Sequence, residues 1–469
     1  MGGFFGAVSR RDCVLDIFFG ADYHSHLGTR RGGMVIYDQE RGFQRQIHNI
    51  ENTPFRTKFE KDIEAFRGCS GIGCISDTDP QPLLVRSHLG LYAIAFVGII
   101  NNAEALVDTC FSDHGHQFMA MSSGKVNQTE LVAALISQKE TLVEGIRHAQ
   151  ELIDGSATIL LLTPEGILAA RDGVGRLPIL VGKGDEGCCV SFESFAYHKL
   201  GYADHYELGP GEIVRVTPEG VEQLAAPGEK MKICAFLWTY YGYPNSNYEG
   251  KNVEVMRYRN GAIMARDEAA AGGVPDVDYV AGVPDSGLDA AIGYANESGI
   301  PYGMCFIKNR YVGRTFIQDS QEQRERSVRI KLNPLRSAVE GKRVVLVDDS
   351  IVRGTTSAHI IELLRKAGAK EVHMRISSPP FMHPCYFGTD ISSREYLIAC
   401  RMSIDEICKQ IGADSLGYLS LESLHKIASS STSSFCDACF TGNYPIDVPQ
   451  EQPEDRFSKK LDTLVKQPK

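Results

Sequence analysis

The chain has 469 residues, 43% of them hydrophobic and 23% charged, so it is long enough for two or three globular domains with cores of their own. Its formal net charge of −10 argues against a nucleic-acid binder that works through bulk electrostatics. The sequence contains no run of about 18 apolar residues to span a membrane, and it starts without the basic segment of a signal peptide. We therefore expect a cytoplasmic protein that binds neither nucleic acid nor membrane.

The first part of the chain, residues 1–230, contains short β-branched and aromatic runs separated by Gly and Asp turns. Helical periodicity covers residues 129–138 and 141–153. Two strands are predicted at 157–162 and 167–171, joined as a hairpin by a turn that contains Pro164 and Gly166. Strands and helices without a regular βαβ alternation are typical of an α+β domain.

The pattern changes from about residue 254, where helices and strands alternate. A helix is predicted at 255–271, a strand at 278–283, a second helix at 288–298 and another strand from Val344. This alternation predicts a parallel sheet covered by helices, in a second domain over residues 231–447. The polar segment 448–469 is predicted to be a surface tail.

A chemical motif lies at the end of the strand at 344–347. The adjacent carboxylates of Asp348 and Asp349 follow this apolar strand, and a turn rich in Gly and hydroxyl groups then opens a helix. Backbone N–H groups at a helix N-terminus favour a phosphate, and carboxylates accept hydrogen bonds from ribose hydroxyls or bind Mg²⁺. An ordinary βα turn with two solvated acids is the alternative. The turn residues are Ser350, Gly354, Thr355, Thr356 and Ser357.

Together with three further motifs, this pattern resembles the glutamine phosphoribosylpyrophosphate (PRPP) amidotransferases, also called amidophosphoribosyltransferases. The further motifs are Asp285-Ser286-Gly287, the basic segment 307–317 and the segment 411–416. The resemblance implies an α+β glutaminase domain of the N-terminal nucleophile fold, followed by an α/β type I phosphoribosyltransferase domain with a parallel sheet. It also implies a glycosyltransferase that forms 5-phosphoribosylamine and pyrophosphate from PRPP, in the first step of de novo purine synthesis.

The resemblance also assigns roles to residues of the second domain. The loop of Asp285, Ser286 and Gly287 would hold pyrophosphate, and Ser286 would join Asp348 and Asp349 around Mg²⁺. Lys308, Arg310 and Arg314 would belong to a flexible loop that closes over PRPP, with Lys308 as a catalytic residue beside the two acids. The PRPP-binding set would then be Asp285, Ser286, Gly287, Lys308, Arg310, Asp348, Asp349, Ser350, Gly354, Thr355, Thr356 and Ser357.

The chain has 13 cysteines, an odd number that favours reduced thiols and metal ligands over a disulfide framework. Cys436 and Cys439 form a single CxxC motif, which alone is weak evidence for metal. The resemblance adds Cys234 and Cys385, so that four thiolates match the ligands of a 4Fe–4S cluster. Zinc accepts the same four ligands and is the alternative.

The glutaminase residues depart from the family pattern. Gly2 stands where the family has its nucleophilic cysteine. Val97 replaces the oxyanion-hole asparagine, Ser76 the arginine that pairs with the glutamine carboxylate, and Gln128 the acid that meets the glutamine amine. Cys13 is a poor substitute nucleophile, because it would need cleavage after Asp12 and is not followed by glycine. The pattern predicts a glutaminase fold without glutaminase activity.

The expected function is therefore PRPP amination with free ammonia, or with ammonia from a separate glutaminase. An alternative is a non-catalytic paralogue that binds PRPP or nucleotides and regulates a true amidotransferase. A glutamine-dependent enzyme is a third possibility, which Gly2 contradicts. The resemblance further implies purine nucleotides as feedback effectors and a homo-oligomer.

Overall fold

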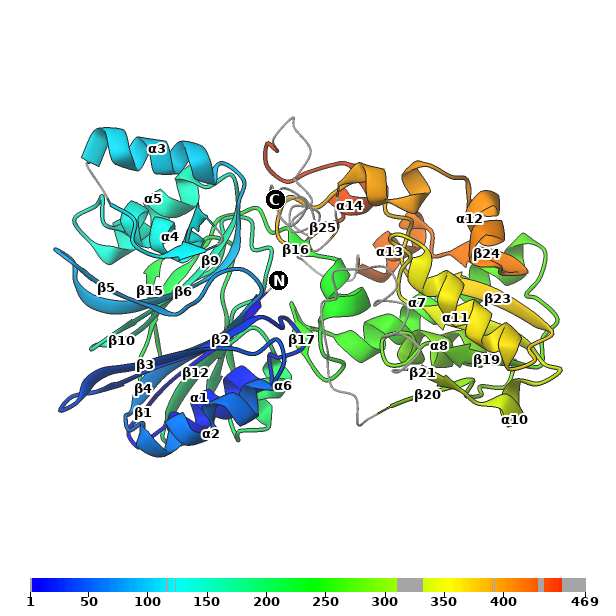
Figure 1. Cartoon of the computed structure of the whole chain (residues 1–469), viewed down its shortest axis with the longest axis horizontal. Coiled ribbons are helices and arrows are strands. Elements are labelled where there is room, and N and C mark those ends of the chain that lie inside the picture. Colours follow the sequence, from blue (N-terminus) through cyan, green and yellow to red (C-terminus); the bar gives the residue numbers. More distant parts are fainter. Residues whose placement is uncertain are drawn as a thin grey trace, which may run out of the picture.

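The computed structural model describes residues 2–114, 117–122, 124–309, 332–389, 391, 393–428 and 434–448. Two halves lie side by side, the N-terminal half on the left of Figure 1 and the C-terminal half on the right. Arg310 and Arg314 of the predicted closing loop and nearly all of the predicted tail 448–469 lie outside the described residues. The domain boundaries at residues 230 and 447 stay predictions.

The N-terminal half contains two antiparallel sheets, in which neighbouring strands pair antiparallel throughout. The first has the order β13-β11-β12-β1-β4-β2-β3 and consists of β1 (Gly2–Ser9), β2 (Arg31–Asp38), β3 (Gly42–Asn49), β4 (Ser70–Ser76), β11 (Leu180–Lys183), β12 (Gly187–Ser191) and β13 (Ala203–Glu207). The second has the order β15-β14-β10-β9-β6-β5 and consists of β5 (Leu83–Ser87), β6 (Gly90–Ile100), β9 (Gly155–Thr163), β10 (Gly166–Ala170), β14 (Ile213–Val216) and β15 (Val221–Ala225).

The predicted hairpin is confirmed, because β9 and β10 pair antiparallel with Leu160 opposite Ala169. Every residue of both strands is buried. This explains their continuous apolar sequence, since a strand that packs on both faces has no solvent side to fill with polar residues.

Helices cover the outer faces of the two sheets, giving four layers in the order helix, sheet, sheet, helix (Figure 1). The predicted helices at 129–138 and 141–153 are confirmed as α4 and α5, and Asn127 caps α4 by accepting hydrogen bonds from the N–H groups of Thr129 and Glu130. The helices of this half are α1 (Val14–Asp22), α2 (Phe55–Ala65), α3 (Ala103–His114), α4 (Gln128–Ile136), α5 (Leu142–Leu152) and α6 (Ser194–His198), and a small ribbon joins β7 (Met121–Ser122) to β8 (Lys125–Val126).

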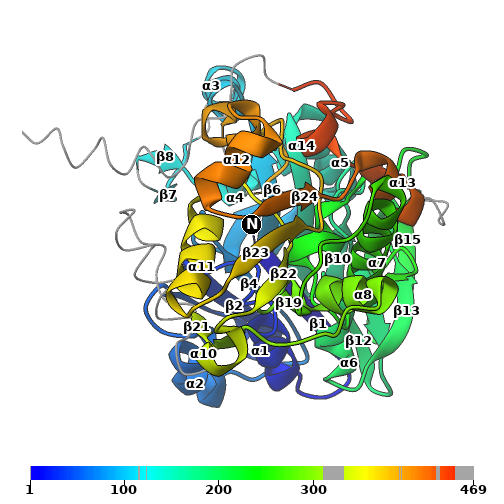
Figure 2. The same cartoon turned by 90° about the vertical axis from the view of Figure 1, so that its right-hand side faces the viewer.

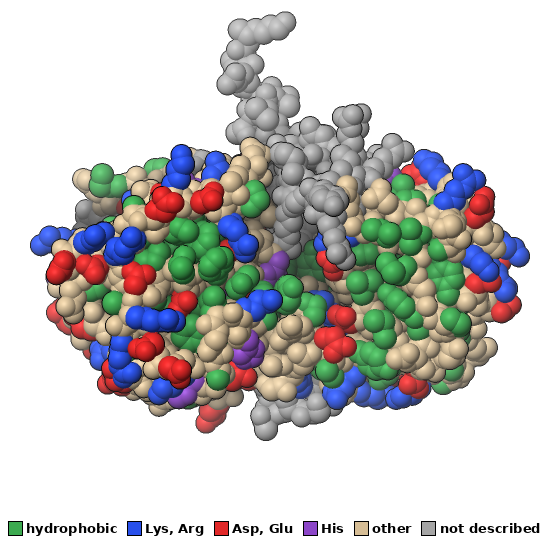
Figure 3. All heavy atoms as spheres, turned by 90° about the horizontal axis from the view of Figure 1, so that it is seen from below, with side chains coloured by type: hydrophobic (Ala, Val, Ile, Leu, Met, Phe, Trp, Pro, Cys, Tyr) green, Lys and Arg blue, Asp and Glu red, His purple; other side chains and the backbone are tan. Residues whose placement is uncertain are grey.

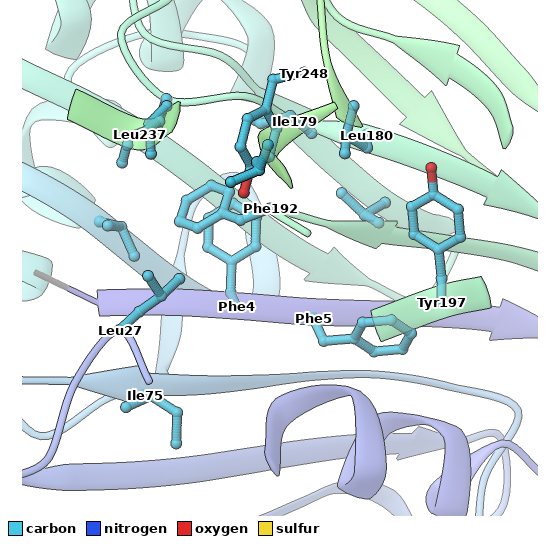
Figure 4. Packing of buried hydrophobic residues seen from close by; sticks show 14 of the residues in the cluster. Phe4, Phe5, Leu27, Ile75, Ile179, Leu180, Phe192, Tyr197, Leu237 and Tyr248 are labelled. Carbon is cyan, nitrogen blue, oxygen red and sulfur yellow. The ribbon is translucent and has the colours of Figure 1, made fainter. Parts of the chain in front are cut away.

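Strand β1 runs through the core of this half. Phe4 and Phe5 are both fully buried and extend from opposite faces of the strand (Figure 4). The ring of Phe4 lies 4.0 Å from that of Phe192, and Leu237 and Tyr248 pack nearby. Each buried aromatic ring contributes about 1.5–3 kcal/mol of transfer free energy. Because Leu237 and Tyr248 follow the N-terminal sheets in the chain, this core also anchors the connection to the second half.

The C-terminal half confirms the predicted alternation of helices and strands. Its sheet has the order β19-β22-β23-β24, with all three pairings parallel. The strands are β19 (Tyr279–Gly282), β22 (Arg343–Asp348), β23 (Glu371–Ile376) and β24 (Ser415–Tyr418). The longer helices are α7 (Val253–Ala271), α8 (Leu288–Ser298), α11 (Thr355–Lys366), α12 (Ile404–Ile411) and α13 (Leu421–Ala428).

Alternate residues of β22 face opposite layers of helices. Val345 and Val347 belong to the cluster that includes Tyr294 of α8, whereas Val344 and Leu346 belong to the cluster that includes Ile360 of α11. Figure 2 shows α11 on one side of the sheet and α7 and α8 on the other. Burial on both faces accounts for the uninterrupted apolar run at 344–347.

Short elements complete the described chain. They are β16 (Ile233–Cys234), the π-helix η1 (Leu237–Tyr241), β17 (Asn247–Tyr248), β18 (Lys251–Asn252), β20 (Phe306–Lys308), β21 (Leu332–Pro334), α10 (Arg336–Val339), η2 (Arg394–Tyr396), η3 (Ile398–Cys400), β25 (Phe435–Cys436) and α14 (Ala438–Thr441). On the face in Figure 3, positive and negative side chains are interspersed around hydrophobic patches. Over the described ranges, no helix is both long and apolar enough to cross a bilayer.

Candidate active site

The two adjacent acids lie at the carboxyl end of the parallel sheet. Asp348 is the last residue of β22, and Asp349 is the first residue beyond it. In parallel sheets, ligands bind at this edge. Gly354 precedes α11 with a φ of 80°, which glycine adopts without a steric penalty. Helix α11 thus begins a few residues after the acid pair. The N–H groups of its first turn have no acceptor within the helix and can bind an anion.

Both carboxyl groups are buried, with exposed fractions of 7% for Asp348 and 6% for Asp349. Asp349 accepts hydrogen bonds from Ser286 Oγ at 2.5 Å and from Ser350 Oγ, and Asp348 Oδ1 accepts one from the N–H of Asp349 at 2.9 Å. Burial raises the pKa of both carboxyls, and the neighbouring Asp349 raises that of Asp348 further. Such a pair gains stability from a nearby cation.

For Asp349, several neighbours oppose the effect of burial on the pKa. After burial, which raises it, the hydrogen bonds from Ser286 and Ser350 and the charge of Arg257 lower the pKa of this carboxyl. Burial is the larger effect, however, so the pKa of each carboxyl lies above its ordinary value.

The predicted pyrophosphate loop connects β19 to α8 beside these acids. Gly287 packs against β22, where a Cβ atom would lie 2.4 Å from the carbonyl oxygen of Val347, so a larger residue would push the loop away. Lys308 forms an ion pair with Asp285, and the two side chains are 46% and 67% exposed. Such an exposed pair contributes little stability, and its lysine can turn to an anionic ligand. The structure brings Ser286 to Asp349 and Lys308 to Asp285; their PRPP-binding roles stay predictions.

A second candidate site is a small pocket at the start of β1. Its volume is about 30 Å³, room for about two water molecules. Gly2 pairs with Ser76 across β1 and β4, and a Cβ atom on Gly2 would lie 2.6 Å from the carbonyl oxygen of Ile75. The pocket lining comprises Gly2, Ser76, Thr78, Gln81, Phe96, Val97, Gly98, Ile99, Arg176 and Gly388.

Two of the three further substitutions meet Gly2 at this pocket. Ser76 is buried, and its hydroxyl accepts a hydrogen bond from the N–H of Thr78 at 3.2 Å. Val97 contributes an apolar side chain to the lining. Gln128 starts α4, outside the lining residues. Cys13 also lies outside them, and burial, followed by the charge of Asp16, raises the pKa of its thiol well above the ordinary value.

The four predicted cluster ligands lie in one neighbourhood between the halves, where Cys234 is buried and the other three are partly buried. Cys234 and Cys436 are opposite each other in the parallel pair β16–β25. Burial, followed by the charge of Cys234, raises the pKa of Cys436 to about 12 and that of Cys439 well above its ordinary value, and Cys385 acts on both thiols. Within the described ranges, however, no three His, Cys, Asp or Glu side chains are arranged as ligands of one ion. The iron–sulfur and magnesium sites stay predictions.

Comparison with known proteins agrees with this architecture. Residues 261–377 match the phosphoribosyl transferase domain family. The chain is 37% identical to an amidophosphoribosyltransferase of Archaeoglobus fulgidus, covering 92% of this chain and 94% of that one, and 40% identical to one of Synechocystis, covering 95% and 91%. The chain belongs to the amidophosphoribosyltransferase family. The Bacillus subtilis glutamine PRPP amidotransferase complexed with ADP and GMP superposes with a TM-score of 0.86 at 37% identity, covering 97% of this chain and 99% of that one.

Membership of the amidophosphoribosyltransferase family confirms the predicted fold class. The chain has an α+β glutaminase-like domain followed by an α/β type I phosphoribosyltransferase domain with a parallel sheet. It also confirms the enzyme class, a phosphoribosyltransferase within the glycosyltransferases.

Two buried charged residues, Arg257 and Glu193, have no signal in the sequence. Arg257 lies in the second turn of α7, and Glu193 precedes α6. The guanidinium of Arg257 donates its hydrogen bonds to backbone carbonyls, and the partners of Glu193 are at least 50 residues away in the chain. Neither arrangement leaves a residue pattern that spacing or periodicity could reveal.

Proposed function

We propose that this chain transfers the phosphoribosyl group of PRPP to ammonia, which forms 5-phosphoribosylamine and pyrophosphate in the first step of purine synthesis. The observation that carries the proposal is the buried pair Asp348 and Asp349, joined through Ser286 to the loop before α8 at the ligand-binding edge of the sheet. The amidophosphoribosyltransferases to which the chain is similar support the same reaction.

Each part of PRPP has a chemical partner in this arrangement. The 5-phosphate would bind the N–H groups and hydroxyls of residues 354–357 at the start of α11. The ribose hydroxyls would donate hydrogen bonds to Asp348 and Asp349. The pyrophosphate would face the loop 285–287 and the exposed ammonium of Lys308.

The reaction is a displacement at the anomeric carbon of the ribose. The ammonia lone pair forms the new C–N bond as the C–O bond to pyrophosphate breaks, and the departing oxygen keeps the electron pair. Positive charge develops on the ribose in the transition state, and the carboxylate of Asp349 would stabilise this charge. Lys308 would stabilise the negative charge of the leaving pyrophosphate. Bound Mg²⁺, held by Ser286, Asp348 and Asp349, would supply further charge neutralisation.

The nitrogen source in this proposal is free ammonia or ammonia from a separate glutaminase. A glycine at position 2 offers no thiol, Ser76 offers no guanidinium for a glutamine carboxylate, and Val97 offers no oxyanion donor.

We also propose a 4Fe–4S cluster on Cys234, Cys385, Cys436 and Cys439. All four are free of disulfide bonds, and their mutual effects on thiol pKa support a common neighbourhood. The donor set suits the cluster because it supplies four thiolates. Zinc would take the same donors, so analysis of iron, zinc and acid-labile sulfide in anaerobically purified protein distinguishes the two.

Purine nucleotides are proposed as effectors of the enzyme, in a homo-oligomer. Support for the nucleotide effectors comes from the B. subtilis relative, whose structure is a complex with ADP and GMP, and from a second similar structure, at a TM-score of 0.85, described as the allosteric regulatory enzyme of purine biosynthesis. The homo-oligomer rests on the family resemblance alone. Nucleotide inhibition of turnover and the mass of the particle in solution test the two parts.

The deciding experiment is an anaerobic assay of pyrophosphate release from PRPP and Mg²⁺. We expect turnover with ammonium and none with glutamine. Equal rates with both donors would contradict the loss of glutaminase. Absence of turnover with either donor would remove the enzyme and favour a regulatory paralogue that only binds PRPP or nucleotides.

A further inference from the structure

The segment 237–248 connects the two halves and is held from both sides by buried charged residues. We call it the connecting segment. It contains the π-helix η1 and ends in β17, and its side chains Leu237 and Tyr248 pack near Phe4 of the N-terminal core (Figure 4). Trp238, the only tryptophan of the chain, lies in this segment and is 4% exposed.

Glu193 holds the connecting segment from the N-terminal half. Its carboxylate, 1% exposed, accepts hydrogen bonds from the N–H of Tyr243 at 3.4 Å, from Ser246 Oγ, and from the hydroxyl of Tyr248 at 2.5 Å. His26 Nε2 lies 3.0 Å from the same carboxylate. Burial raises the pKa of Glu193, but the contacts with His26 and the two hydroxyls outweigh it, so the pKa lies below its ordinary value.

Arg257 holds the connecting segment from the phosphoribosyltransferase half. Its side chain is 3% exposed. Nε donates to the carbonyl oxygen of Trp238 at 3.1 Å, and Nη2 donates to those of Tyr240 at 2.9 Å and Gly242 at 2.8 Å. A planar guanidinium can bind three carbonyls of one turn, whereas an ammonium group lacks this geometry.

The third nitrogen of Arg257 faces the PRPP site. Nη1 lies 3.8 Å from Oδ2 of Asp289, a buried oxygen that accepts no hydrogen bond among the described residues. Asp289 is the second residue of α8, directly after the loop 285–287 that contacts Asp349 through Ser286.

We propose that Arg257 is a positioning residue of the PRPP site, which fastens the start of α8 and the acid pair to the connecting segment. This inference rests on the proposed binding of PRPP at Asp348 and Asp349. Through Glu193 and the connecting segment, the N-terminal half would then support the shape of the PRPP site independently of any glutaminase chemistry.

Three variants test the role. Arg257→Met keeps an unbranched side chain of moderate length but removes the donors and the charge, and Arg257→Lys keeps the charge without the planar fork. Arg266→Met is the matched control, because it removes an arginine of the same helix that pairs with Glu297 of α8 at the surface, with 66% exposure. Thermal unfolding of each variant verifies that it is folded.

Two measurements are made on each full-length protein. Calorimetric titration with PRPP and Mg²⁺, without a nitrogen donor, gives the dissociation constant. The emission of Trp238 gives the state of the connecting segment, since its carbonyl binds Arg257 directly. We expect Arg257→Met to weaken PRPP binding about tenfold or more, with a red shift of the Trp238 emission, as expected when a buried charge-assisted network is broken. Arg257→Lys should lie between this variant and wild type, and Arg266→Met should match wild type.

The inference is overturned if Arg257→Met binds PRPP as tightly as wild type, whatever its emission. Weaker binding with unchanged Trp238 emission would overturn the route through the connecting segment. The proposed function is tested separately. If wild-type protein binds PRPP but releases pyrophosphate with neither ammonium nor glutamine, the proposed enzyme activity is disproved. The role of Arg257 is then still decided by the binding measurements. Wild-type protein that does not bind PRPP would overturn both.

Discussion

Replacing Gly2 by cysteine would restore the thiol of the family nucleophile, and we expect it to produce no useful glutaminase. The added Cβ atom would lie 2.6 Å from the carbonyl oxygen of Ile75, a backbone atom in the paired strand β4. Relief of such an overlap typically costs about 1–3 kcal/mol. For a unit the size of the N-terminal half, this corresponds to a lower melting temperature by about 2–12 °C.

The missing catalytic groups should lower glutaminase activity far more than the overlap at Gly2 does. Val97 cannot donate to an oxyanion, and loss of one such donor lowers kcat by about 10²–10³. Ser76 cannot pair with the carboxylate of glutamine, and loss of a buried charge pair costs about 2–5 kcal/mol, or roughly 30- to 4000-fold. The variant should therefore remain on the order of 10³–10⁶ below a complete site.

The assay is glutamate release from glutamine in the presence of PRPP, after mass spectrometry has verified removal of Met1. Wild type and Gly2→Ser, which adds a side chain of similar size without a thiol, are the controls. Glutamate release by Gly2→Cys within about tenfold of its own ammonium-dependent turnover would refute the reasoning. Such a rate would mean that Val97 and Ser76 do not limit glutamine hydrolysis.

Three further outcomes are expected. Asp349→Asn should lower ammonium-dependent pyrophosphate release about 100-fold or more, since a neutral amide stabilises neither a cationic transition state nor Mg²⁺. Cys436→Ser should remove iron and acid-labile sulfide from anaerobically purified protein, whereas Cys188→Ser should keep both. Burial, followed by the charge of Glu249, raises the pKa of Glu207 from 4.5 to about 7. The Glu207 carboxyl therefore binds more protons in the folded state than in the unfolded state in this range, so its contribution to stability falls as the pH rises from 4.5 to 7. The melting temperature of Glu207→Gln, measured relative to wild type, should rise over the same range.

The strand and helix positions of the C-terminal half could be predicted because each local signal agrees with the parallel fold. The run 344–347 is apolar throughout, and β22 is buried on both faces. Helix α8 spans the predicted residues 288–298, since Gly287 precedes it and Gly299 ends it in the left-handed conformation. The hairpin of β9 and β10 follows from its turn in the same way.

The environment of the candidate site could not be predicted from the sequence. The pKa of Asp349, which burial raises, is lowered by a hydrogen bond from Ser286, 63 residues away in the chain, and by the charge of Arg257 from another helix. Two identical adjacent residues give no sign in the sequence of which distant side chains surround each of them. The overlap that a side chain at Gly2 would meet likewise depends on the pairing of β1 with β4.

The N-terminal half also contacts the connecting segment, through Glu193. Glu193 has three partners in the connecting segment, and replacing it by alanine would leave the buried hydroxyls of Ser246 and Tyr248 without an acceptor, at about 1–3 kcal/mol each. The same segment gives three carbonyls to Arg257 beside the PRPP site. In the proposed ammonia-dependent enzyme, the fold around Glu193 would therefore remain necessary whatever residues surround Gly2.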